Sequence, residues 1–272
     1  MRIASLHRYP VKGFSPEAMG RAVLEKDGFW PGDRMFAVEN GPSGFDAAQP
    51  THDPKIKYLM LMRNESLARL VTRFDDDTQM LTITHEGLEV ARGDVRTAEG
   101  RGTLEAFLAG YCSDELRGPP RLLSAPAGHR FMDSRSGFVS LINHASIAAL
   151  ATHMGAVINP LRFRGNIYVE ELEAHAELEW AEGTRLEAGR GVVLEVIKRI
   201  ERCAATNVDP VTGMRDLHIP KALMKSRGHV DCGVYLRIVA GGVLSAGEHL
   251  SVAASAVANA GFPLLPLSGG DG

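Results

Sequence analysis

Short runs of alternating apolar and polar residues, separated by turn residues, fill the first hundred positions of the chain. Alternation at every second position is typical of strands that bury one face. The pattern predicts strands over Arg2–Tyr9, Ala22–Glu25, Arg34–Glu39, Lys57–Arg63 and Met80–Thr84. The alternation continues from Leu81 to Val90 on both sides of Gly87, which predicts a β-hairpin. We therefore expect this part of the chain to form mainly β-structure.

Two later segments place apolar residues at helical spacing. In the first, positions i, i+3, i+4 and i+7 are occupied by Leu104, Phe107, Leu108 and Tyr111. This spacing makes one buried stripe along a helix, and Thr103 is a suitable N-cap. The second segment has a similar stripe, formed by Ile147, Leu150, Ala151 and Met154. We expect this helix to end at Gly155, because glycine readily adopts the left-handed conformation found at helix C-termini.

Pro, Gly and Ser gather in residues 117–121 and 124–137, where the periodicity breaks. Such a composition predicts a loop. We therefore expect one domain over residues 1–116 and a second over residues 117–255. Residues 256–272 are expected to form a flexible tail.

The second domain also carries β-rich runs, over Asn166–Glu170, Val192–Ile200 and Val234–Val239. The turn Ala240-Gly-Gly242 predicts a hairpin that leads from the last of these runs into Val243–Leu244. We expect a β-rich α+β fold in which an N-terminal β-domain packs against a second β-domain with a few short helices.

Charge and composition narrow the class of protein. The 272 residues contain 30 Lys and Arg against 33 Asp and Glu, a net charge of -3. There is no overall basic excess to favour nucleic acid or an anionic membrane as a partner. Any anionic ligand must then be met by local positive charge.

No run approaches the roughly 18 apolar residues that span a bilayer. The first 16 residues mix basic side chains into the apolar ones, unlike an export signal. We therefore expect a cytoplasmic protein whose cysteines stay reduced. Three cysteines without a CxxC pair form neither a disulfide framework nor a zinc-site pattern.

Three basic clusters could meet an anion. Lys12 lies in the Tyr9-Pro-Val-Lys-Gly13 turn, and Arg34 follows Gly32-Asp33. A solvent-exposed lysine and a surface ion pair are the alternatives for these two. Arg162 and Arg164, followed by Gly165-Asn166, stand two positions apart in a segment that we expect to be extended. Their guanidinium groups should then point the same way and converge on a phosphate or carboxylate, although a solvated strand end is the alternative.

One cysteine stands out by its neighbours. Cys203 follows Lys198, Arg199 and Arg202, and nearby positive charge increases the thiolate fraction that acts as nucleophile or metal ligand. The turn Asp209-Pro-Val-Thr-Gly comes shortly after it, which predicts that Cys203 stands at a strand end. Burial as a small apolar side chain is the alternative, and it is the expectation for Cys112 and Cys232.

Several common motifs are absent. The chain has no HExxH, no GxGxxG, no P-loop pattern and no GxSxG. These absences count against zinc-peptidase, Rossmann, P-loop and α/β-hydrolase chemistry.

Taken together and in order, these clusters resemble the MOSC-domain family preceded by its usual N-terminal β-domain. The segments Tyr9–Gly13 and Gly32–Arg34 are similar to signatures of that N-terminal domain. Those of the second domain resemble the MOSC β-barrel, at Arg162–Ile167, Arg202–Gly213 and Gly233–Arg237 followed by Ala246-Gly-Glu. The resemblance implies a fold in which both domains meet around a cofactor.

The resemblance also implies residue roles. In the amidoxime-reducing and N-hydroxylated-base-reducing relatives, a cysteine binds molybdenum held by a pterin with a phosphate. Carried over, Cys203 would be the metal ligand, and its thiolate suits a soft metal. The cofactor would be held by Lys12, Arg34, Arg164, Asn166 and Thr206, with Arg162 and Arg202 as additions. Asp209 would either orient a group bound to the metal or cap its own turn. Gly13 departs from the serine that often follows the lysine in these relatives.

The function implied is a molybdenum-cofactor oxidoreductase that reduces small N-hydroxylated compounds. The chain lacks a cysteine-rich iron–sulfur segment, so its electrons would come from a separate reductase or a ferredoxin-type protein. Two alternatives remain open: a sulfur carrier or transferase with a persulfide on Cys203, and a cofactor carrier without turnover.

Overall fold

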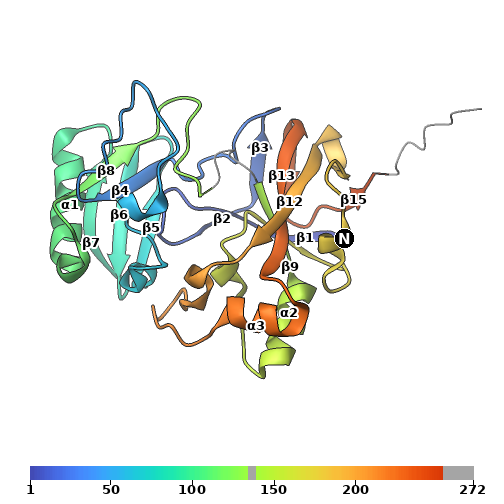
Figure 1. Cartoon of the computed structure of the whole chain (residues 1–272). Coiled ribbons are helices and arrows are strands. Elements are labelled where there is room, and N and C mark those ends of the chain that lie inside the picture. The colour runs from blue at the N-terminus through green and yellow to red at the C-terminus, as the bar shows by residue number, and fades with distance from the viewer. Residues whose placement is uncertain (134–138, 254–272) are drawn as a thin grey trace, which may run out of the picture.

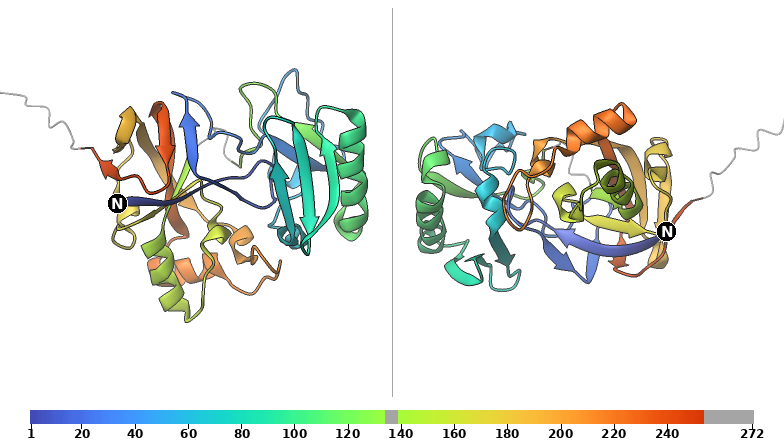
Figure 2. Two further views of the ribbon diagram at one scale, coloured as in Figure 1. Left: turned by 180° about the vertical axis from the view of Figure 1, so that it is seen from behind. Right: turned by 90° about the horizontal axis from the view of Figure 1, so that it is seen from below.

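A computed structural model describes residues 1–133 and 139–253 of the chain. The elements gather into two lobes (Figures 1 and 2), and β-strands dominate both. This confirms the expected β-rich α+β fold. Within the described residues, no helix has the length and apolar character needed to cross a membrane.

The first lobe contains two small antiparallel sheets. One pairs β4 (Phe36–Asn40) with β8 (Pro120–Ser124). The other is a meander of β5 (Leu70–Phe74), β6 (Met80–His85) and β7 (Leu88–Asp94). Helix α1 (Ala98–Tyr111) covers the outside of this lobe (Figure 1). Its 3₁₀ helices are η1 (Lys55–Lys57), η2 (Glu65–Arg69) and η3 (Ser113–Glu115).

The second lobe is built on an eight-stranded sheet in the order β15-β11-β12-β13-β9-β10-β1-β2. Its strands are β1 (Arg2–Arg8), β2 (Glu17–Met19), β9 (Val139–Asn143), β10 (Ile167–Glu170), β11 (Arg185–Ala188), β12 (Val193–Glu201), β13 (Asp231–Ala240) and β15 (Leu250–Val252). Among the described strands of this sheet, β9 and β10 are the only neighbours that run parallel. A separate two-stranded sheet pairs β3 (Arg21–Leu24) with β14 (Gly242–Ser245).

Two α-helices lie below the large sheet, α2 (His144–Met154) and α3 (Ile219–Arg227) (Figure 1). The second lobe also has 3₁₀ helices at η4 (Pro160–Phe163), η5 (Ala176–Glu179), η6 (Gly189–Gly191) and η7 (Ala204–Asn207). The large sheet buries one apolar cluster around Ile3, Leu194 and Leu236. Another cluster, which includes Ile147 and Leu223, packs the helices against the sheet.

The barrel implied for the second domain does not close. β15 and β2 are the two ends of the sheet order, and the bridge between Arg2 and His249 is isolated. The sheet therefore curls back toward β1 without a continuous ladder across the gap.

The chain exchanges segments between the lobes. β1 pairs with β10, so the first strand belongs to the large sheet of the second lobe. β8 pairs with β4 and belongs to the first lobe, although residues 117–121 were expected to be a loop. The chain passes between the lobes around Lys12, whose amide donates to the carbonyl of Phe36 at 2.8 Å. The first two basic clusters therefore lie at the junction of the lobes.

Some local predictions are confirmed. β6 and β7 form the hairpin expected around Gly87, with positive φ angles at Glu86 and Gly87. Helix α2 ends at Gly155, which adopts the left-handed conformation.

The predicted start of α1 is wrong. The helix begins at Ala98, and its N-cap is Thr97, whose hydroxyl accepts from the Gly100 amide at 3.0 Å. A side chain on Gly93 would overlap the carbonyl of Gly100, so the two glycines allow α1 to lie close to β7. Glycines in the first turn weaken the helical pattern in the sequence, but tertiary packing requires at least Gly100 there.

Two predicted strand arrangements are also wrong. Lys57–Arg63 forms a turn with one bridge at Tyr58, because the Asn64 side chain accepts from the Met60 amide at 3.0 Å and holds the chain bent. The hairpin expected at 240–244 does not form, because β14 pairs with β3. Gly241 lies against the backbone of Leu24, where a side chain would clash. The predicted tail lies outside the described residues.

Candidate functional site

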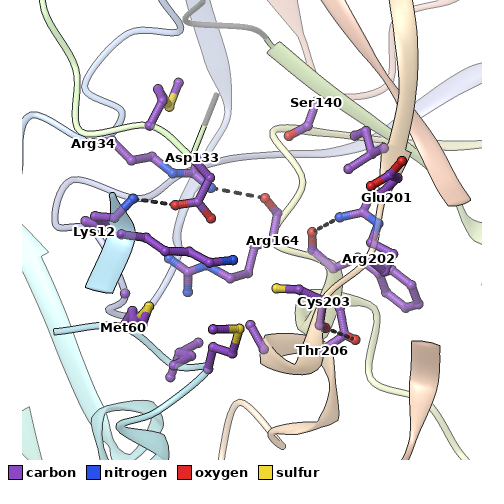
Figure 3. Close-up of a pocket in the computed structure, with 18 of the residues that line it drawn as sticks. Lys12, Arg34, Met60, Asp133, Ser140, Arg164, Glu201, Arg202, Cys203 and Thr206 are labelled. Atoms are coloured by element: carbon purple, nitrogen blue, oxygen red, sulfur yellow. Dashed lines mark hydrogen bonds and ion pairs between the residues drawn. The ribbon is translucent and has the colours of Figure 1, made fainter. Parts of the chain in front are cut away.

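A cavity of about 150 Å³ lies where the two lobes meet (Figure 3). The first lobe contributes Lys55, Met60, Leu61 and Met62, and the crossing segment contributes Lys12 and Arg34. From the second lobe come Ser140, Arg162, Arg164, Asn166, Arg202, Cys203 and Thr206. Every residue expected to hold the cofactor therefore lines one cavity.

Cys203 stands just beyond the end of β12, as expected for a strand end, and caps the start of η7. The Thr206 amide and hydroxyl both donate to the Cys203 carbonyl, at 3.1 and 2.9 Å. Its side chain is half-buried, and its sulfur points into the cavity (Figure 3). The backbone of the thiol is thus held by its own turn while the sulfur stays accessible.

The other two cysteines are buried, as expected. Cys112 is packed in the apolar core of the first lobe, and Cys232 lies in the cluster beneath the large sheet. Burial raises the pKa of both thiols to about 12. Neither lines the cavity, so Cys203 is its thiol.

Lys12 is buried, with 6% of its surface exposed. Its ammonium group donates to the Phe131 carbonyl at 3.0 Å and forms an ion pair with Asp133 at 2.5 Å. Partial desolvation would raise the pKa of Asp133, whose side chain is 57% exposed, but Lys12 and other nearby cations lower it to about 2. Burial has the opposite consequence for Lys12 and lowers its pKa. The alternative that Lys12 is a solvent-exposed lysine is therefore excluded.

Arg34 and Arg164 both contact the buried ring of Tyr9. Their guanidinium carbons lie 4.4 and 4.3 Å from the ring centroid. Arg34 pairs with Asp33, which is fully buried, at 2.5 Å. Arg164 donates to the Phe14 carbonyl at 2.6 Å and forms no ion pair with any described carboxylate. Burial and the neighbouring Arg34 lower the pKa of Arg164 to about 10.

The predicted convergence of Arg162 and Arg164 is wrong. The segment is not extended, since Arg162 lies in η4 and Arg164 has a left-handed backbone with φ of 51°. The two side chains therefore leave in different directions. Arg162 donates to Asp209 at 2.9 Å and Asp216 at 2.8 Å, while Arg164 reaches the Tyr9 ring.

One carboxylate oxygen of Asp209 accepts from its own loop, and the other accepts from η4. One accepts from the amides of Val211 and Thr212 at 2.9 and 2.8 Å, and the other accepts from Arg162. Burial alone would raise its pKa, but the two amides and Arg162 lower it. Asp209 caps its turn and does not line the cavity.

Arg202 and Asn166 are also held by the protein. Arg202 donates to the carbonyls of Cys232 and Phe163, at 2.7 and 2.8 Å. The Asn166 side chain accepts from the Ser140 hydroxyl at 2.9 Å and donates to the His7 carbonyl at 3.2 Å. The Asn166 bonds connect β9 to β1, and the Arg202 bonds connect the segment that leads to Cys203 to β13 and η4.

Comparisons with known proteins cover both lobes. The model of the MOSC N-terminal beta barrel domain matches residues 1–110, and that of the MOSC domain matches residues 128–251. The chain belongs to the MOSC family. MOSC domains are often associated with the molybdenum cofactor.

Among curated relatives, molybdenum cofactor sulfurase from Caenorhabditis briggsae is 32% identical to this MOSC protein over 114 residues. The match covers 39% of this chain and 16% of that relative, so the chain spans a small part of the relative's length. Among solved structures, the YUAD protein from Bacillus subtilis is 12% identical with a TM-score of 0.44, over 92% of this chain and 93% of that chain. YiiM from Geobacillus stearothermophilus is 19% identical with a TM-score of 0.36, over 51% and 69%.

The donor set of the MOSC pocket suits an anionic group that carries a soft metal. A half-buried thiol and the guanidinium of Arg164, which has no ion-pair partner among the described residues, face one cavity. Thiolate sulfur favours soft metals, and guanidinium groups favour phosphate oxygens. No described cluster of three His, Cys, Asp or Glu side chains could hold a metal by itself.

Several cavity residues of this MOSC protein could not be predicted as site residues from the sequence. Met60, Met62 and Lys55 come from a segment that was expected to be a strand or had no motif. Asp133 follows a loop and approaches Lys12 only through the fold. Ser140 was visible as a hydroxyl in a β-rich run, but its bond to Asn166 depends on the pairing of distant segments.

Proposed function

We propose that this cavity binds the molybdenum cofactor, with the Cys203 thiolate as a ligand of the metal, and that the protein reduces small N-hydroxylated compounds. The observation that carries the proposal is the placement, in one cavity, of an accessible thiol and a half-buried guanidinium, that of Arg164, which forms no ion pair with a described carboxylate. An anion would relieve the repulsion between Arg34 and Arg164 and compensate their desolvation.

The residues have separate tasks in this proposal. Arg164, Arg34 and Lys12 would bind the phosphate and polar edges of the cofactor, with Asn166 and Thr206 beside them. Arg162, Arg202 and Asp209 use their hydrogen bonds within the protein and would position the turn that carries Cys203. When bound, the cofactor would supply two-electron redox chemistry, while the protein supplies anchoring charge and access.

A separate electron donor is part of the proposal. A reductase or a ferredoxin-type protein would deliver two electrons, which together with two protons from solvent convert an N-hydroxyl group to an amine and water. The described part of the chain contains one accessible thiol and no iron–sulfur ligand set, which favours a donor outside this part of the chain.

Metal analysis tests the proposal directly. Protein purified from a host that makes the cofactor should contain about one molybdenum per chain and should reduce 6-hydroxylaminopurine with an artificial electron donor. Cys203→Ala and Arg164→Gln should each lose metal, while Cys112→Ala and Arg185→Gln serve as matched controls. Wild-type protein without molybdenum and without reductase activity would contradict the proposal, and metal without activity under any donor would indicate a cofactor carrier.

Sulfur transfer is a second candidate, favoured by the name of the sulfurase relative and by the accessibility of Cys203. In that role the Cys203 thiolate would accept a sulfur atom from a persulfide donor, release the donor's thiolate and pass the sulfur on. Intact-mass analysis should then show an addition of about 32 Da that a thiol reductant removes. Sulfur transfer that persists in Cys203→Ser would exclude this candidate.

A further inference from the structure

The loop that follows Cys203 reaches from the second lobe onto the first. Its base is a bridge between Val208 and Arg215, and the Asp209 amide donates to the Met214 carbonyl at 2.8 Å. At its tip, Gly213 has a φ of +73°, and a Cβ there would come within 3.0 Å of the Glu65 carbonyl. The loop is therefore a compact hairpin whose glycine allows close packing on η2.

Arg215 joins this loop to one wall of the cavity. Its Nη2 atom donates to the carbonyls of Leu61 and Met62 at 3.0 and 2.9 Å, and to the Glu65 carboxylate at 2.8 Å. Its Nη1 atom donates to the carbonyl of Ala204, the residue after Cys203, at 3.3 Å. One guanidinium thus connects the 61–65 segment of the first lobe to the turn that carries the thiol.

The wall held by Arg215 is apolar. Met60, Leu61 and Met62 line the cavity without a charge, whereas its cations are Lys12, Arg34, Lys55, Arg162, Arg164 and Arg202. Met60 and Cys203 lie on facing sides of the space in Figure 3. Methionine side chains are flexible and polarisable, and they make favourable contacts with aromatic rings. The separation of this wall from Cys203 depends on contacts between the lobes, of which Arg215 makes three.

We propose that Met60 and Met62 form a specificity-determining wall for molecules that reach Cys203. Arg215 is a positioning residue that sets the width of the opening between this wall and Cys203. The class of molecule favoured is flat and apolar on one face, such as a heteroaromatic ring. The proposal concerns access to the thiol and does not depend on which reaction the site performs.

Alkylation of Cys203 by two reagents of different size tests the width of the opening between the methionine wall and the thiol. The full chain is prepared from a host unable to make the molybdenum cofactor, and Cys203 is followed by peptide mass spectrometry with iodoacetamide and with bicyclic monobromobimane. In each case the sulfur–carbon bond forms as halide leaves. Arg215→Ala should increase the bimane rate by about fivefold, because the wall spends more time displaced, with little change in the iodoacetamide rate.

Matched variants distinguish the positioning role of Arg215 from a general destabilisation of the protein. Arg215→Lys retains a cation beside Glu65 but not the geometry that serves several carbonyls, so it should lie between wild type and Arg215→Ala. Arg185→Ala removes an exposed arginine of β11 that has its own glutamate partner, and it should leave both rates unchanged. An unchanged ratio of the two rates in a folded Arg215→Ala, or an equal change in Arg185→Ala, would overturn the positioning role.

A polar substitution of similar length tests the wall itself. Met62→Gln should lower the bimane rate relative to iodoacetamide, because the thioether contact with the ring is lost. Met224→Gln on α3 is the control, since Met224 is half-exposed and does not line the cavity. A ratio in Met62→Gln equal to that of wild type would exclude the wall from selecting the reagent. Because both readouts use only the thiol, their failure would leave cofactor binding to be decided by metal analysis.

Discussion

Replacement of Arg162 by methionine should destabilise the whole protein. The Arg162 side chain is 1% exposed and donates to the Asn207 carbonyl at 2.9 Å, as well as to Asp209 and Asp216. These bonds connect η4 to both ends of the loop that follows Cys203. Methionine roughly keeps the volume of the side chain, so the lost stability comes mainly from the ion pairs and hydrogen bonds of Arg162.

The expected loss follows from the burial of each partner. Removing one member of a fully buried pair costs about 3–5 kcal/mol, because the remaining charge loses its compensation. Here the Asp209 and Asp216 side chains are 19% and 44% exposed, so water can solvate them in part. The free energy of unfolding should therefore fall by about 2–3 kcal/mol. In a chain of this size, the melting temperature should fall by about 5–10 °C.

Urea unfolding and thermal melting measure this change. The matched control is Arg185→Met, because Arg185 is 57% exposed and its contact with Glu195 is 3.5 Å long. The control should change stability by less than about 0.5 kcal/mol. A loss below about 1 kcal/mol in Arg162→Met would refute the argument that the ion pairs of this buried arginine hold the loop.

Three further outcomes are expected. At pH 8, iodoacetamide should modify Cys203 in the native protein, while Cys112 and Cys232 stay unmodified on the same time scale. The reason is that a pKa of about 12 leaves only about one in 10⁴ of these two thiols as thiolate. Peptide mass spectrometry measures the labelling, and comparable labelling of all three cysteines would contradict the prediction. Inorganic phosphate at about five times its Kd should raise the melting temperature by about 3 °C in wild type and not in Arg164→Gln, since the anion compensates the half-buried Arg164 cation. Equal shifts would place the phosphate elsewhere. The pKa of Asp133 is lowered to about 2 in the folded state, so the carboxylate stabilises the protein above pH 3.8, its ordinary pKa, and this stabilisation is lost as the pH falls from 3.8 toward 2. The difference in urea midpoint between wild type and Asp133→Asn should therefore shrink from pH 6 to pH 3. Parallel profiles would show that the ion pair with Lys12 contributes nothing to stability.

Local signals in the sequence predicted the elements whose pattern is self-contained. The β6–β7 hairpin and the end of α2 at Gly155 needed only alternation, helical spacing and a glycine with positive φ. The pairing of β14 with β3 could not be predicted in this way, because the two strands are about two hundred residues apart and either could pair with other partners. The glycine that allows their approach looks like an ordinary turn residue in the sequence.

The sequence by itself determined which residue types could form the site. Its motifs identified Cys203, Lys12, Arg34 and Arg164, and all four line one cavity. It also distinguished Cys203 from the two cysteines that the fold buries.

Only the tertiary structure decided what each arginine does. Arg162 and Arg164 are two positions apart, yet the left-handed backbone at Arg164 sends one to Asp209 and Asp216 and the other to the Tyr9 ring. The tertiary structure also brought the Met60–Met62 wall and Arg215 to the thiol, through contacts more than 150 residues apart. The physical reason is that sequence spacing sets only local direction, whereas the partner of a buried charge is chosen by whichever distant segments pack around it.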